Sequence, residues 1–245
     1  MFGQSGIGKS VLQGTHGGLL MTTEAEGAIS AKARGSKADE LKVSSWEEWL
    51  AYMDWLEHSG HKEFHWVGLD SLDELEEHAW NSIMGSVKGT ARSVGGAFRS
   101  RSRNDYPLVW AAIADQVDRL VRLPTNVLIT AKTMRVDVET DEGEDTTLAL
   151  PLVGSTKRGD LAMKICGKMT LVGYYRGKRN EETGKKVRRL HTEDSDRWVA
   201  KDRHDTFGRS VVNPDVTAME KDVMERLASG SRPVRRKRRT ASGNA

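Results

Sequence analysis

The residues best suited to chemistry lie at the start of the chain, in the segment Gly3–Ser10. Its order, Gly-Gln-Ser-Gly-Ile-Gly-Lys-Ser, fits the P-loop pattern G-x-x-x-x-G-K-[ST]. Glycines let the backbone turn tightly and point consecutive N–H groups at phosphate oxygens. The Lys9 ammonium is then expected to reach the β- and γ-phosphates, and the Ser10 hydroxyl to hold Mg²⁺. The predicted phosphate-binding residues are Gly3, Gln4, Ser5, Gly6, Ile7, Gly8, Lys9 and Ser10.

Two acidic residues are expected beside these phosphates. Residues 64–70 are typical of a mostly apolar strand that ends in an acid, the Walker B pattern, and Asp70 would support the Mg²⁺ shell. Residues 19–23 are typical of a short buried parallel strand, which Glu24 follows. A carboxylate at the C-terminal end of such a strand faces the nucleotide crevice, where Glu24 could orient or deprotonate the attacking water. The alternative interpretation of Glu24 is an acidic turn.

The elements that must position these groups alternate along the chain between strands and helices, which predicts a parallel α/β sheet. A P-loop normally follows a buried central strand of about five residues. Only Met1 and Phe2 precede Gly3, so this first strand is expected to be missing or severely shortened. The other strands are expected at 19–23, 64–70 and 127–130, with helices at 46–56 and 106–121.

Later in the chain the pattern changes to shorter, more antiparallel strands. They are expected at residues 169–175, 187–191 and 197–200, and a last helix is expected at 216–227. Lys201 and Arg203 come directly after the third of these strands. Two cations that stand two residues apart on an extended segment point to the same side, so this pair can project together at a phosphate.

Composition is typical of a protein with a sizeable core and no membrane partner. The 245 residues are 37% hydrophobic and 30% charged, and no apolar run approaches the roughly 18 residues that span a bilayer. The single cysteine, Cys166, excludes an intramolecular disulfide and fits a reducing cytoplasm. We therefore expect a cytoplasmic protein with one domain over residues 1–230 and a disordered basic tail over 231–245.

Three basic segments are candidates for contact with a nucleic-acid backbone. Residues 85–105 are rich in glycine and serine, residues 153–159 are polar, and the tail carries six cations and no acid in a chain of net charge +3. Such segments suit a phosphate backbone. The alternatives are a solvated loop and a solubilising terminus. The candidate DNA-binding residues are Lys88, Arg92, Arg99, Arg101, Arg103, Lys157, Arg158, Arg235, Arg236, Lys237, Arg238 and Arg239.

In combination these features resemble the RecA-like ATPase core, whose fold is a mostly parallel central sheet flanked by helices, with antiparallel strands added toward the C-terminus. More narrowly, the chain resembles the phage-encoded RecA-like ATPases that act in single-strand annealing and recombination. The P-loop is specific for nucleotide, and the combination is what points to the family. The similar segments cover most of residues 1–210, namely Gly3–Ser10, Thr23-Glu24, Leu69-Asp70-Ser71, Asp105-Tyr106, Asn126–Thr130 and Ala200-Lys201-Asp202-Arg203.

The resemblance implies that ATP and Mg²⁺ bind at the P-loop and that Lys9 takes part in catalysis. It also implies that Glu24 is the base. Lys201 and Arg203 resemble the Lys-x-Arg pair that reaches the γ-phosphate of a neighbouring subunit. Arg203 would then be an arginine finger that completes the site only in a homo-oligomer, either a ring or a filament.

The chain departs from the family pattern at two positions near the expected site. Lys132 stands close to where relatives often carry a histidine. Glu26 competes with Glu24 for the role of the base, because the local match is short. Both carboxylates therefore stay open as candidates for activating water.

The leading functional hypothesis is an ATPase of phage recombination or annealing that binds single-stranded DNA in the host cytoplasm, with a single-strand-binding protein as a further partner. One alternative is a nucleotide-gated DNA-binding or annealing module with negligible turnover, which would be indifferent to loss of Glu24. Another is a hexameric helicase or packaging motor, for whose accessory domain 245 residues leave little room. A P-loop kinase is disfavoured because no compact acceptor lid is recognisable.

Overall fold

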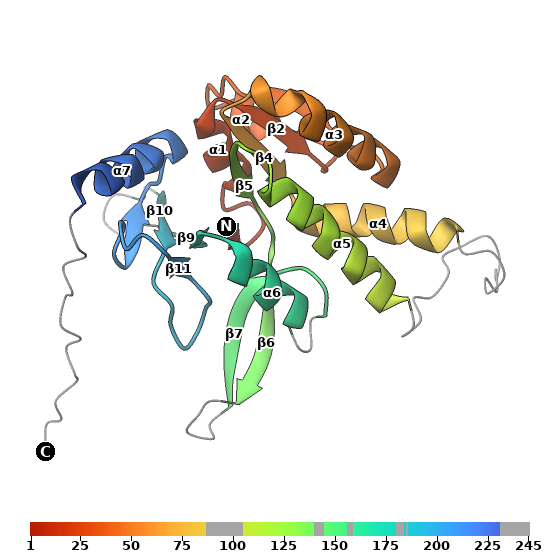
Figure 1. The fold of residues 1–245 in the computed structure, drawn as a ribbon. Coiled ribbons are helices and arrows are strands. Elements are labelled where there is room, and N and C mark those ends of the chain that lie inside the picture. Colours follow the sequence, from red (N-terminus) through yellow and green to blue (C-terminus); the bar gives the residue numbers. More distant parts are fainter. Residues whose placement is uncertain (87–104, 140–144, 156–158, 180–183, 185, 231–245) are drawn as a thin grey trace, which may run out of the picture.

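The computed structural model describes residues 1–86, 105–139, 145–155, 159–179, 184 and 186–230. In this part of the chain a central sheet lies between two layers of helices (Figure 1). Parallel strands come first, and antiparallel strands are added toward the C-terminus. The fold is therefore α/β with a mostly parallel central sheet, as the alternation of strands and helices predicts.

The central sheet contains four parallel strands in the order β3-β2-β4-β5. Their registers place Thr22 of β2 opposite Asp70 of β4, and Leu69 opposite Ile129 of β5. The strands consequently end nearly level, so that the polar residues at their carboxyl ends share one edge. The bounds are β2 (Leu19–Thr22), β3 (Asp39–Lys42), β4 (Trp66–Asp70) and β5 (Asn126–Ile129).

Strand β1 comprises Phe2–Gly3. It takes a central place in the sheet, because Phe2 bridges Ala131 just beyond β5 and pairs in parallel with Tyr174 of β9 (Tyr174–Arg179). The Phe2 amide donates to the Gly173 carbonyl over 2.9 Å, and the Gly3 amide to the Ala131 carbonyl over 3.2 Å. The P-loop thus leaves the sheet between β5 and β9.

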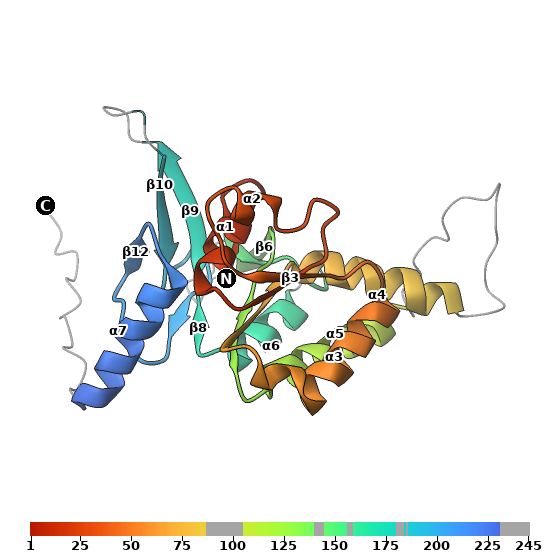
Figure 2. The ribbon, with the colours of Figure 1, turned by 90° about the horizontal axis from the view of Figure 1, so that it is seen from above.

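Antiparallel pairing begins beyond β9. Strand β10 (Lys186–His191) pairs with β9 on one side and with β12 (Ser210–Val212) on the other. Figure 2 shows β9 and β10 side by side as a ribbon that extends past the rest of the sheet. Two further antiparallel pairs are β6 (Thr133–Glu139) with β7 (Asp145–Pro151), and β8 (Leu171–Val172) with β11 (Lys201–Asp202).

Alternate side chains of β2 point to opposite faces of the sheet and so identify its two helical layers. Leu19 and Met21 belong to the large core with helices α3 (Trp46–His58), α4 (Leu72–Ser86), α5 (Tyr106–Val121) and α6 (Asp160–Lys168). Leu20 lies on the other face against α2 (Ile29–Lys32). A smaller core joins α1 (Lys9–Gln13) to α7 (Val216–Ser229). Two short 3-10 turns, η1 (Gly14–His16) and η2 (Gly60–Lys62), complete the elements.

Helix α3 illustrates how the sequence sets these elements. The Ser45 side chain accepts a hydrogen bond from the Glu48 amide over 3.1 Å, which caps the first turn. Trp46, Trp49, Met53 and Leu56 recur at helical spacing and are all buried. None of the helices within the described residues has the length and apolar character that a membrane span requires.

Two of the expected later strands differ from the observed ones. Residues 169–175 are interrupted at Gly173, and β9 then continues to Arg179. Residues 197–200 do not form a strand: Trp198 makes isolated bridges to Ala149 of β7 and to Ser195, and its ring packs against Tyr174 and His191, with centroid distances of 5.6 and 4.8 Å. The strand begins only at Lys201.

Candidate nucleotide site

The P-loop follows β1 and leads into α1. Gly6 and Gly8 have φ angles of 70° and 103°, which lie in the left-handed region that favours glycine. Gly3 is needed for a different reason, since a Cβ there would lie 2.5 Å from the carbonyl oxygen of Tyr175 in β9. These three glycines therefore serve separate structural needs, and a side chain at any of them would disturb the loop.

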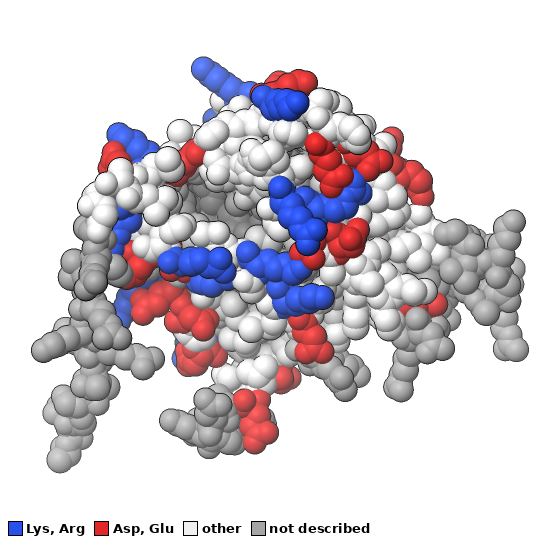
Figure 3. Space-filling model, in the orientation of Figure 1, with Lys and Arg blue, Asp and Glu red and all other residues white. Residues whose placement is uncertain are grey.

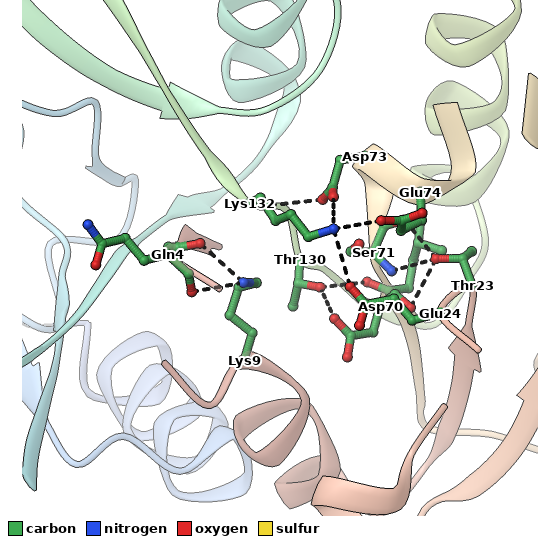
Figure 4. A network of polar contacts seen from close by, with 12 residues as sticks. Gln4, Lys9, Thr23, Glu24, Asp70, Ser71, Asp73, Glu74, Thr130 and Lys132 are labelled. Atoms are coloured by element: carbon green, nitrogen blue, oxygen red, sulfur yellow. Dashed lines mark hydrogen bonds and ion pairs between the residues drawn. The ribbon is translucent and has the colours of Figure 1, made fainter. Parts of the chain in front are cut away.

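Lys9 is buried at the start of α1, with 8% of its surface exposed. Its ammonium donates hydrogen bonds to the carbonyl oxygens of Gly3 and Gln4, over 3.1 and 3.2 Å (Figure 4). Burial lowers the pKa of this ammonium, and the negative charges of Asp70 and Glu24 partly oppose that effect. The cation is thus held inside the loop by neutral oxygens and faces carboxylates across the site.

Asp70 ends β4 and is fixed by residues of the two neighbouring strands. Its carboxylate accepts a hydrogen bond from the buried Thr130 hydroxyl at the end of β5. The Thr23 hydroxyl, at the end of β2, accepts from the Ser71 amide over 2.8 Å and contacts the Asp70 carbonyl over 3.2 Å. The peptide bond between Asp70 and Ser71 is cis. These contacts orient the carboxylate at the common carboxyl edge of the sheet.

Glu24 lies beside the same edge, and its side chain is about half exposed. Its carboxylate is 3.5 Å from the Lys132 ammonium, which also lies 3.0 Å from Asp73 and 2.6 Å from Glu74 (Figure 4). Burial lowers the pKa of Lys132, but its hydrogen bonds to Glu74 and Asp73 raise that pKa by more. Lys132 is therefore a permanent cation that holds one side of Glu24.

A cleft of about 450 Å³ brings Lys9, Ser10, Glu24 and Asp70 together, whereas the exposed Glu26 is not among the described residues that line it. Hydroxyl and carboxylate oxygens are the ligands that Mg²⁺ prefers, and cations suit phosphate. The residues present therefore fit a nucleoside triphosphate with Mg²⁺. The remaining lining residues are Ser5, Gly6, Gly8, Val11, Ser30, Ala33, Arg34 and Arg188.

Arg188 is a cleft residue that sequence reasoning missed. It lies on β10 opposite Gly177 of β9, and its Nε donates to the Ile7 carbonyl of the P-loop over 2.8 Å. The neighbouring Lys186 ammonium donates to the Gly6 carbonyl over 3.3 Å. A Cβ on Gly8 would lie 3.0 Å from the Arg188 Nε, so the glycine leaves room for this cation. No local sequence signal marks Arg188, because its approach to the P-loop depends on the register between β9 and β10.

Lys201 and Arg203 lie together but away from the cleft. The Lys201 ammonium donates to the carbonyls of Cys166 and Gly167 at the end of α6, over 2.8 and 3.1 Å, and Arg203 reaches the Gly167 carbonyl over 3.5 Å. Strand β11 pairs with β8, which precedes β9, so the pair lies at the sheet edge opposite the P-loop. Figure 3 shows Lys and Arg side chains gathered over α6 and β11 on this face.

The candidate DNA-binding residues are not placed by the structure. Lys88, Arg92, Arg99, Arg101 and Arg103 fall within 87–104, outside the described residues. The same is true of the two cations in 156–158 and of the tail from residue 231 onward, that is, of Lys157, Arg158, Arg235, Arg236, Lys237, Arg238 and Arg239.

The sequence matches the family described as AAA domain over residues 1–204. Among solved structures, the chain is similar to the flagellar accessory protein FlaH from Methanocaldococcus jannaschii, with 10% sequence identity and a TM-score of 0.39. That similarity covers 86% of this chain and 81% of FlaH. No curated protein matches the sequence.

Proposed function

This chain belongs to the AAA domain family and carries an ATPase-type P-loop domain, and we propose that it hydrolyses ATP between its own copies while it holds single-stranded DNA. The observation that carries this proposal is the cleft itself. Lys9, Ser10, Asp70 and Glu24 come from separate segments of the chain and line one space at the carboxyl edge of the sheet.

Each of these four groups has a role that its contacts support. Lys9 would exchange the Gly3 and Gln4 carbonyls for the stronger charge of phosphate oxygens. Ser10 and Asp70 would hold Mg²⁺, which neutralises charge on the phosphates. Glu24 would accept a proton from a water molecule whose oxygen bonds to the γ-phosphorus, while the bond from that phosphorus to the departing ADP oxygen breaks.

The need for a second copy is argued from the Lys-x-Arg pair. Lys201 and Arg203 lie at the sheet edge opposite the P-loop, so they cannot reach phosphates in the cleft of their own chain. A neighbouring copy could bring its Arg203 to this cleft, and an arginine finger of that kind accelerates phosphoryl transfer by about 10³-fold or more. The proposal therefore requires a homo-oligomer, as a ring or a filament.

DNA is proposed as the partner because of the basic segments at 85–105, 153–159 and 231–245. A role in annealing or recombination, together with a single-strand-binding protein, follows from the same proposal. Nucleotide at the interface between copies would direct the segments at 85–105 and 153–159 toward DNA, and hydrolysis would release them.

One observation favours a second candidate, a nucleotide-gated DNA-binding module with little turnover. Glu24 is 3.5 Å from Lys132, and a carboxylate that contacts a cation is less available to contact an attacking water. In this alternative ATP binds and changes the affinity for DNA, but Glu24 has no catalytic task.

The deciding experiment measures ATP hydrolysis with and without single-stranded DNA over a range of protein concentrations. Hydrolysis by shared sites should be stimulated by DNA and should rise more steeply than the protein concentration. ATP binding without stimulated turnover would favour the gated module. Absence of ATP binding would contradict both candidates.

A further inference from the structure

The ribbon formed by β9 and β10 has two chemically different faces. Residues directly opposite each other in an antiparallel pair point to the same side. The inner face, toward the P-loop, carries Tyr175, Gly177, Arg179, Lys186, Arg188 and Leu190. The outer face carries Tyr174, Arg176, Lys178, Val187, Arg189 and His191.

Charge on the outer face is uncompensated at its centre. Arg176 lies directly opposite Arg189, and both residues are exposed. Within the part of the chain that the structure describes, neither of these arginines forms an ion pair with an acid. Nearby Glu193 is 3.3 Å from Arg209 instead. Like charges directly across a strand pair destabilise it, so this arrangement calls for an external anion.

Aromatic rings lie beside Arg176. The Arg176 guanidinium lies 5.8 Å from the centre of the Tyr174 ring and 5.9 Å from that of Trp198. The Trp198 and His191 rings are 4.8 Å apart, and both are only partly buried. Burial lowers the pKa of His191, and the positive charges of Arg176 and Arg189 lower it further, so this imidazole is neutral at pH 7. A neutral ring and an indole offer flat surfaces on which a base can stack.

We propose that this outer face, with Trp198, binds single-stranded nucleic acid, its arginines contacting phosphates and its rings stacking on bases. Exposed cations next to aromatic rings are the combination that sequence-tolerant single-strand binding uses. The site is distinct from the basic segments at 85–105, 153–159 and 231–245. The choice of single-stranded nucleic acid as the partner rests on the proposed function. The position of the site rests on residues that the structure describes.

The inner face of the same ribbon connects this surface to the nucleotide cleft. Lys186 and Arg188 hold the Gly6 and Ile7 carbonyls of the P-loop. The Ile7 side chain packs on Gly177, where an added Cβ would lie 2.6 Å from it. A nucleic-acid strand bound to the outer face would thus be separated from the phosphate-binding loop by the β9–β10 ribbon alone. Each ligand should then change the affinity for the other by the same factor.

The test uses the full chain and a fluorescently labelled oligo-dT, with binding followed by anisotropy over a series of salt concentrations. The variant is Arg176→Gln with Arg189→Gln. The matched control is Arg135→Gln with Arg226→Gln, which removes the same charge from β6 and α7. ATP affinity is measured on every variant, so that failure of the nucleotide site is seen separately. A thermal unfolding curve checks that each variant is folded.

The outer-face variant should bind oligo-dT at least tenfold more weakly at low salt than the control does. Its slope of log affinity against log salt should fall by about 1.4, because each phosphate contact with a single strand contributes about 0.7. Arg176→Lys with Arg189→Lys should restore most of that slope, since it restores the charge. Equal affinity and slope in the outer-face variant and the control would overturn the proposal. Tighter binding of duplex than of oligo-dT would overturn its single-strand part.

Trp198→Phe gives an independent measure of stacking. Binding of oligo-dT should quench tryptophan fluorescence in the wild type, and the Phe variant should lose most of that quenching while keeping its salt slope. Undiminished quenching in the Phe variant would mean that the indole does not contact the strand. Oligo-dT that fails to bind the wild type at all would overturn the surface, whereas retained ATP binding would leave the nucleotide site standing.

Discussion

Three cations at or beside the nucleotide cleft, Lys9, Arg188 and Lys132, are held by oxygens of the chain, whereas the two arginines at the centre of the outer face of the β9–β10 ribbon face each other. Lys132 pairs with Asp73 and Glu74, and the buried Lys9 is held by carbonyl oxygens opposite carboxylates. Arg176 and Arg189 instead face each other without an acid among the described residues. Lys9 in the cleft would therefore exchange one set of oxygens for another when a nucleotide binds, while the ribbon has positive charge available for a polyanion.

The largest effect should follow from removing Lys9, the buried cation of the cleft. Lys9→Ala is expected to abolish ATP binding, because the loop loses the ammonium that makes charge-assisted bonds to phosphate. Titration calorimetry with ATP measures it, and the exposed Lys37→Ala serves as the control. ATP binding at wild-type affinity in the Lys9 variant would show that the cleft does not use its buried cation to bind phosphate. The contrast between the cleft and the outer face of the ribbon would then be wrong.

The next largest effect concerns a cation outside both regions, Arg203 beside α6. Arg203→Ala should leave ATP affinity unchanged and reduce DNA-stimulated turnover by about 10³-fold, the usual worth of an arginine finger. The measurement is steady-state ATP hydrolysis in the presence of oligo-dT. Arg197→Ala, an exposed cation a few residues away, should turn over like the wild type. Wild-type turnover in the Arg203 variant would exclude the finger.

A smaller effect distinguishes the two candidate bases. Glu24→Gln is expected to lower turnover by about 10²-fold with ATP binding retained, because a general base typically contributes that factor or more. Glu26→Gln should leave turnover unchanged, since Glu26 is exposed and does not line the cleft. The reverse result would assign the base to Glu26, and no effect from either change would favour the nucleotide-gated module.

The smallest expected effect is a pH dependence of the free energy of unfolding, which arises from the buried His16. His16 packs on Trp66 and accepts a hydrogen bond from the Gly18 amide over 3.0 Å. Burial lowers the pKa of His16 to about 4. The unfolded chain therefore binds a proton at higher pH than the folded one, and stability is lost as the pH falls from about 6.5 to about 4.

The loss attributable to His16 should be on the order of 1–3 kcal/mol across that window. Urea unfolding of the wild type and His16→Gln at pH 7 and pH 4.5 measures it. The wild type should lose more stability than the variant between the two pH values, and carboxylates such as Glu40 and Asp118 contribute equally to both. Equal losses would mean that the buried ring is protonated without cost.

Those parts of the site that lie within one contiguous segment could be predicted from the sequence. The glycines and Lys9 of the P-loop, and the apolar run that ends in Asp70, carry their geometry in local spacing. The parallel sheet followed from alternating strand and helix patterns.

What could not be predicted depends on pairing between distant strands. Arg188 reaches the P-loop only because β10 pairs with β9 in a register that sets it opposite Gly177, about 180 residues after Ile7 along the chain. The strand expected at 197–200 is reduced to isolated bridges from Trp198 to Ala149 and Ser195, pairings that no local pattern shows. The outer face likewise cannot be predicted from one segment, because it is formed by alternate residues of two paired strands.

The most direct test of shared active sites mixes two inactive variants. Lys9→Ala cannot bind ATP but keeps its finger, and Arg203→Ala binds ATP but lacks the finger. Hydrolysis with oligo-dT is measured for each variant alone and for an equal mixture. If ATP is hydrolysed at sites shared by two copies, the mixture should regain a substantial part of wild-type activity. In some pairs, a cleft with an intact Lys9 lies next to a copy with an intact Arg203. A mixture that stays as inactive as its components would contradict the account.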